Sequence, residues 1–490
     1  MIFLKTLLSS RPFMLVRQLS CVFLCSCLLL GTNAFGIVKL SGSIANPISD
    51  SVKISYNDNK LAYYPKEFYA LVDKKGNFSV TVTLPSGTYM QTEITHGNHL
   101  AEVMLYDGDS LHLTADSYHF DSSIHYNGTG SEVQNFVALH TITRGRLNQY
   151  TLRVKNILGK EPEQFYAGIE EERKKEEDYA NKSPYKLPQQ FKKIWLAHFE
   201  YYNYFFLQQY PLMHQMMKLQ RYTDTVPAEN YRVLKYMPQK FNDDLLQVPS
   251  YLLYLTGVFE TKLKAAGLGF PSSDTQKARI LLDSLITLGY KNLPTQSCEY
   301  FVAQGLYARI RVQEVNRTKQ ELNKFTTHFP HSQYLHLLQY QLDIAERLLP
   351  GKVAPDFQTS TVTGNQINLS DIHDTVVYVT FWASWCKQCV GEMRMMERKV
   401  KPLFVNKPVR FVYVSLDEET SVAKQVINQF KVAGHHTYTS GSWYADVAVK
   451  YGIQALPAYF LIDKKGKFAV TNPPTPQRPT ELIVAISRLY

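Results

Sequence analysis

The sequence predicts a multidomain chain with a β-rich N-terminal part, an α-helical middle and an α/β C-terminal part. Apolar and polar residues alternate in segments such as 36–42 and 78–84, as expected where successive side chains of a strand point to opposite faces. Longer helical periodicity begins near residue 131. From residue 350, strand-length apolar runs alternate with helical stretches, which favours a sheet covered on both faces. A chain of 490 residues exceeds one ordinary core.

The first 34 residues have the composition of an export signal. Their only charges are three basic residues, an apolar run follows at 19–30, and small residues end the segment at Ala34. We therefore expect cleavage after Ala34 and a mature protein in the periplasm or cell envelope. The apolar run is shorter than the ~20 residues of a membrane-spanning helix. A retained membrane anchor, or a lipid anchor at Cys27, is the alternative.

Residues 35–130 form the predicted β-rich domain, an antiparallel sandwich or a small barrel. Clusters such as 73–77 and 107–109 contain the Gly and Asp residues that tight hairpin turns require. Both kinds of architecture place one face of every strand against an apolar core.

Residues 131–349 form the predicted α-helical domain, rich in Tyr, Leu, Gln and Lys. Its aromatic cluster between 201 and 210 is expected to be helix core and not a ligand platform. The mixed charge run 170–178 is expected to be a solvated helix face. Segment 349–355, with two prolines and a glycine, is the predicted linker to the last domain, 350–490.

The C-terminal domain is predicted to alternate strands with helices. Its strands are short runs rich in β-branched and aromatic residues, and its hairpin contains Asp and Gly at turn positions. In chain order we expect a strand at 376–381, a helix from 386 to about 403, a strand at 409–416, a helix at about 421–432, a strand at 459–462, a hairpin at 463–466, a strand at 467–470 and a helix from about 480.

Segment 381–389 places two cysteines three residues apart, directly after the first of these strands. If a helix begins at Cys386, its unpaired N–H groups and its dipole favour a thiolate there. Cys389 lies one turn further on, close enough to close a small disulfide. Because the thiolate is the reactive form in disulfide exchange, the arrangement favours redox chemistry.

The remaining cysteines do not form a second pair. Three of the six lie in the predicted signal, and Cys298 is expected to be an isolated buried thiol. Zinc sites use the same Cys-x-x-Cys spacing, but a zinc ion would need two more ligands. Cys298 and His435-His436 could supply them on paper, but structural zinc sites usually show a second paired motif, which is missing here. No metal and no cofactor are therefore expected beyond the redox-active disulfide.

Residues 350–490 resemble the TlpA/ResA-like exported thiol–disulfide oxidoreductases of the thioredoxin superfamily, which implies a thioredoxin fold. The rest of the chain resembles, more loosely, regions that precede such domains in envelope proteins of Bacteroidetes-type bacteria. The motifs of the specific resemblance are an entry segment, the turn after it, the active-site motif, a Glu-Met pair, a cis-proline loop and the following strand, at 354–357, 368–372, 381–389, 392–393, 451–457 and 460–463.

By this resemblance Cys386 is the attacking thiol and Cys389 resolves the mixed disulfide. Trp385 would shield one side of the disulfide. Leu456-Pro457 is expected to be cis, with the backbone before the proline pairing with a bound substrate strand. Glu392 is expected to take or relay the proton of the resolving thiol; the alternative is a surface glutamate in the first turns of a helix.

The chain departs from the family pattern between the cysteines. Lys387-Gln388 replaces a dipeptide in which proline is common, so the direction of electron flow stays open; Lys387 favours the thiolate by its charge. Thr380 stands where cytosolic thioredoxins have a buried acid, which leaves Glu392 as the proton-relay candidate. Peroxidase activity is not expected, because Val379 and Ala383 stand where peroxiredoxins have Pro and Thr.

Two functions follow as hypotheses. The first is an exported thiol–disulfide oxidoreductase that reduces or exchanges disulfides in envelope proteins through Cys386–Cys389, with a membrane electron donor because the periplasm is held oxidising. The second is an envelope binding or scaffold protein in which the redox domain is secondary. The net charge of +10 comes without a dense basic stripe, so no nucleic-acid partner is expected. The substrate and the oligomeric state are not indicated.

Overall fold

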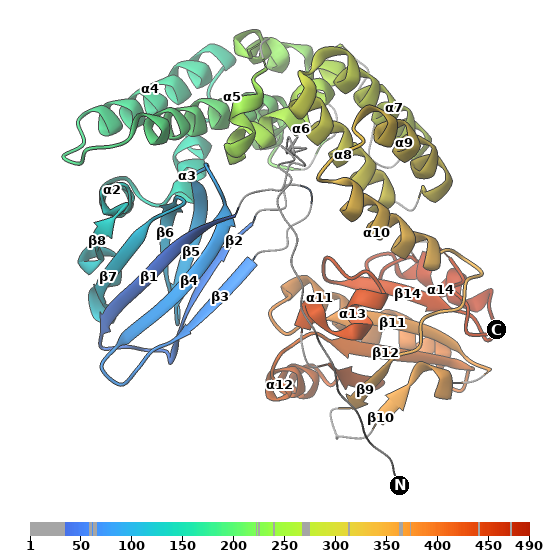
Figure 1. Ribbon diagram of the computed structural model, residues 1–490. Helices are drawn as coiled ribbons and strands as arrows, with labels where there is room; N and C mark the ends of the chain where they lie inside the picture. The colour runs from blue at the N-terminus through green and yellow to red at the C-terminus, as the bar shows by residue number, and fades with distance from the viewer. Residues whose placement is uncertain are drawn as a thin grey trace, which may run out of the picture.

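The computed structural model shows an arch with β strands at one end, helices along the top and an α/β domain at the other end (Figure 1). The predicted export signal, residues 1–34, lies outside the described residues. Among the helices that are described, none is both long and apolar enough to cross a membrane. The structure describes residues 35–57, 61, 66–221, 223, 226–238, 241–266, 275–311, 314–361, 366–372, 374–439, 442–470 and 473–490.

The N-terminal part contains two four-stranded sheets, with strand orders β4-β1-β7-β8 and β3-β2-β5-β6. Inward residues of both sheets share one apolar core, as the alternation of β1 and β4 predicts. The strands are β1 Phe35–Ala45, β2 Ser51–Tyr56, β3 Lys66–Leu71, β4 Asn77–Pro85, β5 Met90–His96, β6 His99–Leu105, β7 Ser110–Asp116 and β8 His125–Thr129, with a short helix α1 Phe120–Ser123 before β8.

The prediction of a β-rich N-terminal part is confirmed, but the predicted antiparallel sandwich or small barrel is not. β1 pairs with β7 in parallel, so the prediction of purely antiparallel pairing is wrong at this pair. The described strands form two separate sheets and no closed barrel. Alternation predicts which face of a strand is buried, whereas the choice of neighbour depends on long-range packing.

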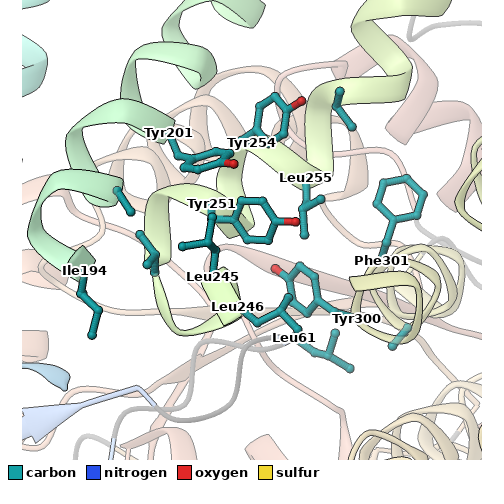
Figure 2. Close-up of a cluster of buried hydrophobic side chains, with 14 of the residues drawn as sticks. Leu61, Ile194, Tyr201, Leu245, Leu246, Tyr251, Tyr254, Leu255, Tyr300 and Phe301 are labelled. Carbon is teal, nitrogen blue, oxygen red and sulfur yellow. The ribbon is translucent and has the colours of Figure 1, made fainter. Parts of the chain in front are cut away.

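Helices occupy the middle of the chain, and their aromatic side chains form one large core. Figure 2 shows Tyr201, Tyr251 and Tyr254 gathered in it, with the rings of Tyr201 and Tyr251 4.7 Å apart. The aromatic cluster predicted as helix core is confirmed, since its Tyr201, Phe206 and Tyr210 are buried. The helices are α2 Ser131–Arg144, α3 Tyr150–Lys155, α4 Pro162–Asn181, α5 Gln189–Leu219, α6 Pro249–Ala265, α7 Thr275–Asn292, α8 Thr295–Arg311, α9 Val315–His328 and α10 Leu335–Arg347.

One residue of the charge run corrects the prediction of a solvated helix face. Glu176 of α4 is fully buried, where its carboxylate contacts His140 at 2.9 Å, Arg144 at 2.7 Å and Arg153 at 2.8 Å. A buried charge is tolerated only with such partners. Most of the other acidic residues of the run do pair at the surface, for example Glu171 with Lys175.

The C-terminal part is a six-stranded sheet with the order β10-β9-β13-β12-β11-β14. β11 is buried along its whole length and pairs in parallel with β12 and antiparallel with β14. Two apolar cores cover the sheet's two faces. The elements are β9 Gln358–Thr361, β10 Gln366–Asn368, β11 Val376–Trp382, α11 Lys387–Met395, β12 Val409–Ser415, α12 Thr420–Phe430, β13 His435–Tyr438, α13 Asp446–Lys450, β14 Ala458–Ile462 and α14 Pro479–Ser487.

Two predicted elements of this part differ in the structure. The helix expected over 386–403 is α-helical only to Met395 and continues as a π turn and a 3₁₀ turn, since Pro402 offers no N–H and crowds the preceding turn. The strand expected over 467–470 is reduced to isolated bridges at Lys467 and Phe468. β9, β10, β13 and α13, which have five residues or fewer, were not predicted.

The linker is held by backbone hydrogen bonds to the segment after the last hairpin. Gly351 N–H donates to the Phe468 carbonyl at 2.8 Å, Phe468 N–H donates to the Lys352 carbonyl at 2.9 Å, and Ala354 N–H donates to the Gly466 carbonyl at 2.9 Å. The helical part therefore passes into the α/β part through an ordered connection.

Candidate active site

Cys386 and Cys389 are joined by a disulfide, with their Cα atoms 5.2 Å apart. Cys386 is the N-cap residue of α11, and its Sγ accepts a hydrogen bond from the Cys389 N–H at 3.1 Å. An N–H donor and the positive end of the helix dipole both stabilise negative charge on this sulfur. Cys386 is 8% exposed whereas Cys389 is fully buried, so the first sulfur is the one that a partner can reach.

A buried carboxylate holds the loop between β11 and α11. Ser384 donates to Asp417 from its N–H at 2.9 Å and from its Oγ at 2.7 Å, and Ser415 Oγ donates to the same carboxylate at 2.7 Å. Sequence reasoning missed Asp417. A signal was present, because Ser384 and Asp417 each follow the end of a parallel strand by two residues, and such ends meet at one edge of a sheet.

Glu392 lies buried beneath the cysteine pair on α11, so the alternative of a surface glutamate is wrong. Its Oε1 accepts from Gln388 Nε2 at 2.8 Å and from Gln477 Nε2 at 2.9 Å, and its Oε2 accepts from the Tyr459 hydroxyl at 2.6 Å. Three donors surround it, which suits a carboxylate. Burial, together with the hydrogen bond to Glu392, raises the pKa of the Tyr459 hydroxyl, so Tyr459 remains a donor. The relay role of Glu392 stays a prediction.

The residues predicted to contact substrate lie at the same end of the sheet. Trp385 is 58% exposed, and its ring lies 6.0 Å from that of Trp443, which sequence reasoning had not singled out. The Leu456–Pro457 peptide bond is cis. Because Ala458, the next residue, pairs with Phe381 of β11, the proline loop lies next to the active-site loop.

Cys298, His435 and His436, the other ligands considered for a zinc site, do not belong to the active-site loop or to α11. Cys298 is a buried free thiol on α8, as predicted, and burial raises its pKa to about 11. His435 and His436 belong to β13, and burial lowers the pKa of His436 to about 4. Across the part of the chain that the structure describes, no three His, Cys, Asp or Glu residues are grouped as metal ligands would be.

Comparisons with known proteins concern this C-terminal part. Residues 349–481 match the Redoxin family. The "Thiol-disulfide oxidoreductase ResA" of Bacillus thuringiensis (strain Al Hakam) is 33% identical over 122 residues, 25% of this chain and 68% of the relative. The "Thioredoxin-like protein YneN" of Bacillus subtilis (strain 168) is 30% identical over 24% of this chain and 66% of the relative. A crystal structure, the thioredoxin domain of a thiol–disulfide oxidoreductase from Bacteroides vulgatus, is 25% identical with a TM-score of 0.26, covering 29% of this chain and 97% of that chain.

Alkylation rates test whether Cys386 is the more accessible and more reactive of the two active-site cysteines. In the folded, oxidised protein begun at residue 35, we expect iodoacetamide to modify no cysteine at pH 8, since Cys298 is buried with a pKa of about 11. After reduction, Cys386 should react on the order of ten times faster than Cys389, because only it reaches the surface at a helix N-terminus. Peptide mapping by mass spectrometry measures both rates. Faster modification of Cys389 than of Cys386 would contradict the assignment.

Hydrogen exchange tests whether the Asp417 carboxylate holds the loop between β11 and α11 in place. Asp417→Ala removes the acceptor of buried donors on Ser384 and Ser415, which costs about 1–3 kcal/mol. Amides of the 383–386 loop should then exchange roughly ten to a hundred times faster. Glu418→Ala, at the exposed neighbouring position, is the control and should leave their exchange within about two-fold. Equal protection of these amides from exchange in both variants would show that the loop does not depend on its hydrogen bonds to Asp417.

Proposed function

The chain belongs, through its C-terminal domain, to the ResA-like thiol–disulfide oxidoreductases, and from this premise we propose that it is exported and reduces disulfides in proteins of the cell envelope. The observation that carries the proposal is the Cys386–Cys389 disulfide at the start of α11, with one sulfur at the surface. The exposed ring of Trp385 beside it offers an apolar contact to a protein partner.

The reaction begins from the reduced pair. The Cys386 thiolate attacks one sulfur of the substrate disulfide, that disulfide breaks, and the first substrate thiolate leaves. Cys389 then loses its proton and attacks the Cys386 sulfur, which releases the second substrate thiolate and forms the disulfide that the structure contains. Two electrons pass from the enzyme dithiol to the substrate, and both substrate thiolates take up protons.

Glu392 is the proposed acceptor of the Cys389 proton. Cys389 is fully buried, so solvent does not reach its thiol directly, and a carboxylate one helical turn away supplies a base. Gln388, Gln477 and Tyr459 hold that carboxylate in place. Gln388 belongs to the dipeptide between the cysteines, whose chemistry could not be interpreted from the sequence alone.

Turnover requires a source of electrons outside the chain. After each cycle the pair is a disulfide, and an oxidising envelope does not reduce it. We therefore assign the supply of electrons to a dithiol protein of the membrane. The relatives are named thiol–disulfide oxidoreductases, a name that leaves the direction of electron flow open; reduction is the direction that we propose.

Cysteine substitutions test the proposed reaction. In the chain begun at residue 35, Cys386→Ser should abolish dithiothreitol-driven insulin reduction, because the attacking thiol is lost. Cys389→Ser should instead accumulate a mixed disulfide with the substrate, visible on non-reducing gels. Cys298→Ser is the matched control and should retain turnover. Full function of Cys386→Ser in the native host would instead support the binding or scaffold hypothesis.

Acid–base variants test Glu392. Glu392→Gln should lower the rate of mixed-disulfide resolution at pH 7 on the order of a hundred-fold, because the base is lost. The defect should narrow as the pH rises past the ordinary thiol pKa, near 8.5, because Cys389 then ionises without help. Tyr459→Phe keeps the ring and removes one donor to the carboxylate, and should have a smaller effect. Rapid-quench mass spectrometry follows the intermediate, with exposed Glu418→Gln as control. A defect of constant size at every pH would assign Glu392 a purely structural role.

A further inference from the structure

A pocket of about 380 Å³ lies between the cis-proline loop and two helices of the helical part. The α/β part contributes Ile453, Pro457 and Phe460 to its wall, and α8 and α10 contribute Ile310, Arg311 and Ile344. Figure 1 shows α8 and α10 over the end of the α/β part that carries β14 and α14. The pocket is therefore built jointly by two parts of the chain.

Direct contacts hold the two walls together. Tyr307 of α8 donates to Gln454 Oε1 at 2.6 Å, and Gln454 Nε2 donates to Gln341 Oε1 of α10. Gly452 has a φ of +60°, and a Cβ there would lie 2.7 Å from Ile344 Cγ2, so the helix packs directly on the loop backbone. The helical part thus packs against the loop that precedes the cis proline.

The wall combines apolar side chains with polar ones, and it carries positive charge. Among the residues of the wall that the structure describes, Arg311 and Arg478 are the charged ones and none is a carboxylate. Arg478 pairs with Glu481 at 3.0 Å. Arg311 is exposed at the end of α8 and has no ion pair with any described residue. An apolar side chain with an acidic neighbour complements this surface.

The pocket lies next to the redox site. Pro457 belongs both to the cis bond beside the active-site loop and to the pocket wall. The wall also includes Tyr459, whose hydroxyl holds Glu392. β14 is the last strand of the sheet, but Leu461 and Ile462 at its far end already pair with Ala469 and Phe468. An extended peptide segment could therefore pair only with the part of β14 next to Pro457. A polypeptide whose disulfide meets Cys386 lies next to Pro457, which is a residue of the pocket wall.

We propose that this pocket binds the segment next to the disulfide of the protein substrate, and selects segments with an apolar side chain beside an acidic one. The proposal rests on the proposed reductase function and specifies its substrate class. The helical part then acts as one wall of the substrate site, because Ile310, Arg311 and Ile344 come from it.

Peptide disulfides test the selection. Two cysteine peptides, one with Leu-Asp and one with Leu-Lys beside the cysteine, are each joined by a disulfide to 5-thio-2-nitrobenzoate. Reduced enzyme converts each to the free peptide thiol and the coloured thiolate, and stopped-flow absorbance gives the second-order rate constants. We expect a preference for Leu-Asp of roughly ten-fold, the size of one charge-assisted contact. Arg311→Glu should reverse it, whereas Arg347→Glu, on α10 outside the pocket, should retain it.

A crosslink locates the peptide independently of the charge effect. Cys389→Ser traps the mixed disulfide with a peptide that carries benzoylphenylalanine in place of Leu. Irradiation should attach it to α8, α10 or the 453–460 segment, as mapped by mass spectrometry. Equal rates for both peptides in the native protein, an Arg311→Glu ratio equal to the native one, or crosslinks only around Trp443 would overturn the proposal. Failure to reduce any disulfide, including the symmetric nitrobenzoate disulfide, would instead reject the proposed function.

Discussion

The register of β11 with its two neighbours is the constraint on which the site depends. Trp382 at the end of β11 pairs with Ser415 at the end of β12, and Phe381 pairs with Ala458 at the start of β14. The active-site loop, Asp417 and Pro457 therefore meet at one edge of the sheet. A shift by one residue would turn every side chain of β11 to the other face, and both faces are buried against different cores.

Two buried carboxylates serve this edge in different ways. Asp417 receives donors from the active-site loop and from the end of β12, so its burial is compensated by fixing the loop that carries the disulfide. Glu392 receives side-chain donors from α11, from β14 and from the segment before α14. It therefore joins three elements under the cysteine pair. A water-filled site could not hold a base in one place so firmly, because water would compete for each hydrogen bond.

The parts of the site that could be predicted are those that local sequence specifies. Cys386 and Cys389 follow an apolar run at the start of a predicted helix, and Pro457 lies in a motif that resembles the family's cis-proline loop. Asp417, Tyr459 and Gln477 could not be predicted as readily, since their contacts join residues 33, 67 and 85 positions apart. The same distinction holds for the fold. Alternation of apolar and polar residues predicted β1 and β4, but the parallel β1–β7 pair depends on contacts between residues about 70 positions apart.

The ordered linker decides how the helical part acts on the redox part. A flexible connection would let the helices sample many positions, and any wall they formed would cost conformational entropy at each binding event. Here the linker bonds to the N–H and the carbonyl of Phe468 and to the carbonyl of Gly466. Ile344 of α10 and Leu348, directly after that helix, belong to the apolar core of the α/β part. The proline loop and the helices are thus packed as one surface before a substrate arrives. Such preorganisation reduces the cost of binding, so residues outside the redox domain are placed to set its specificity.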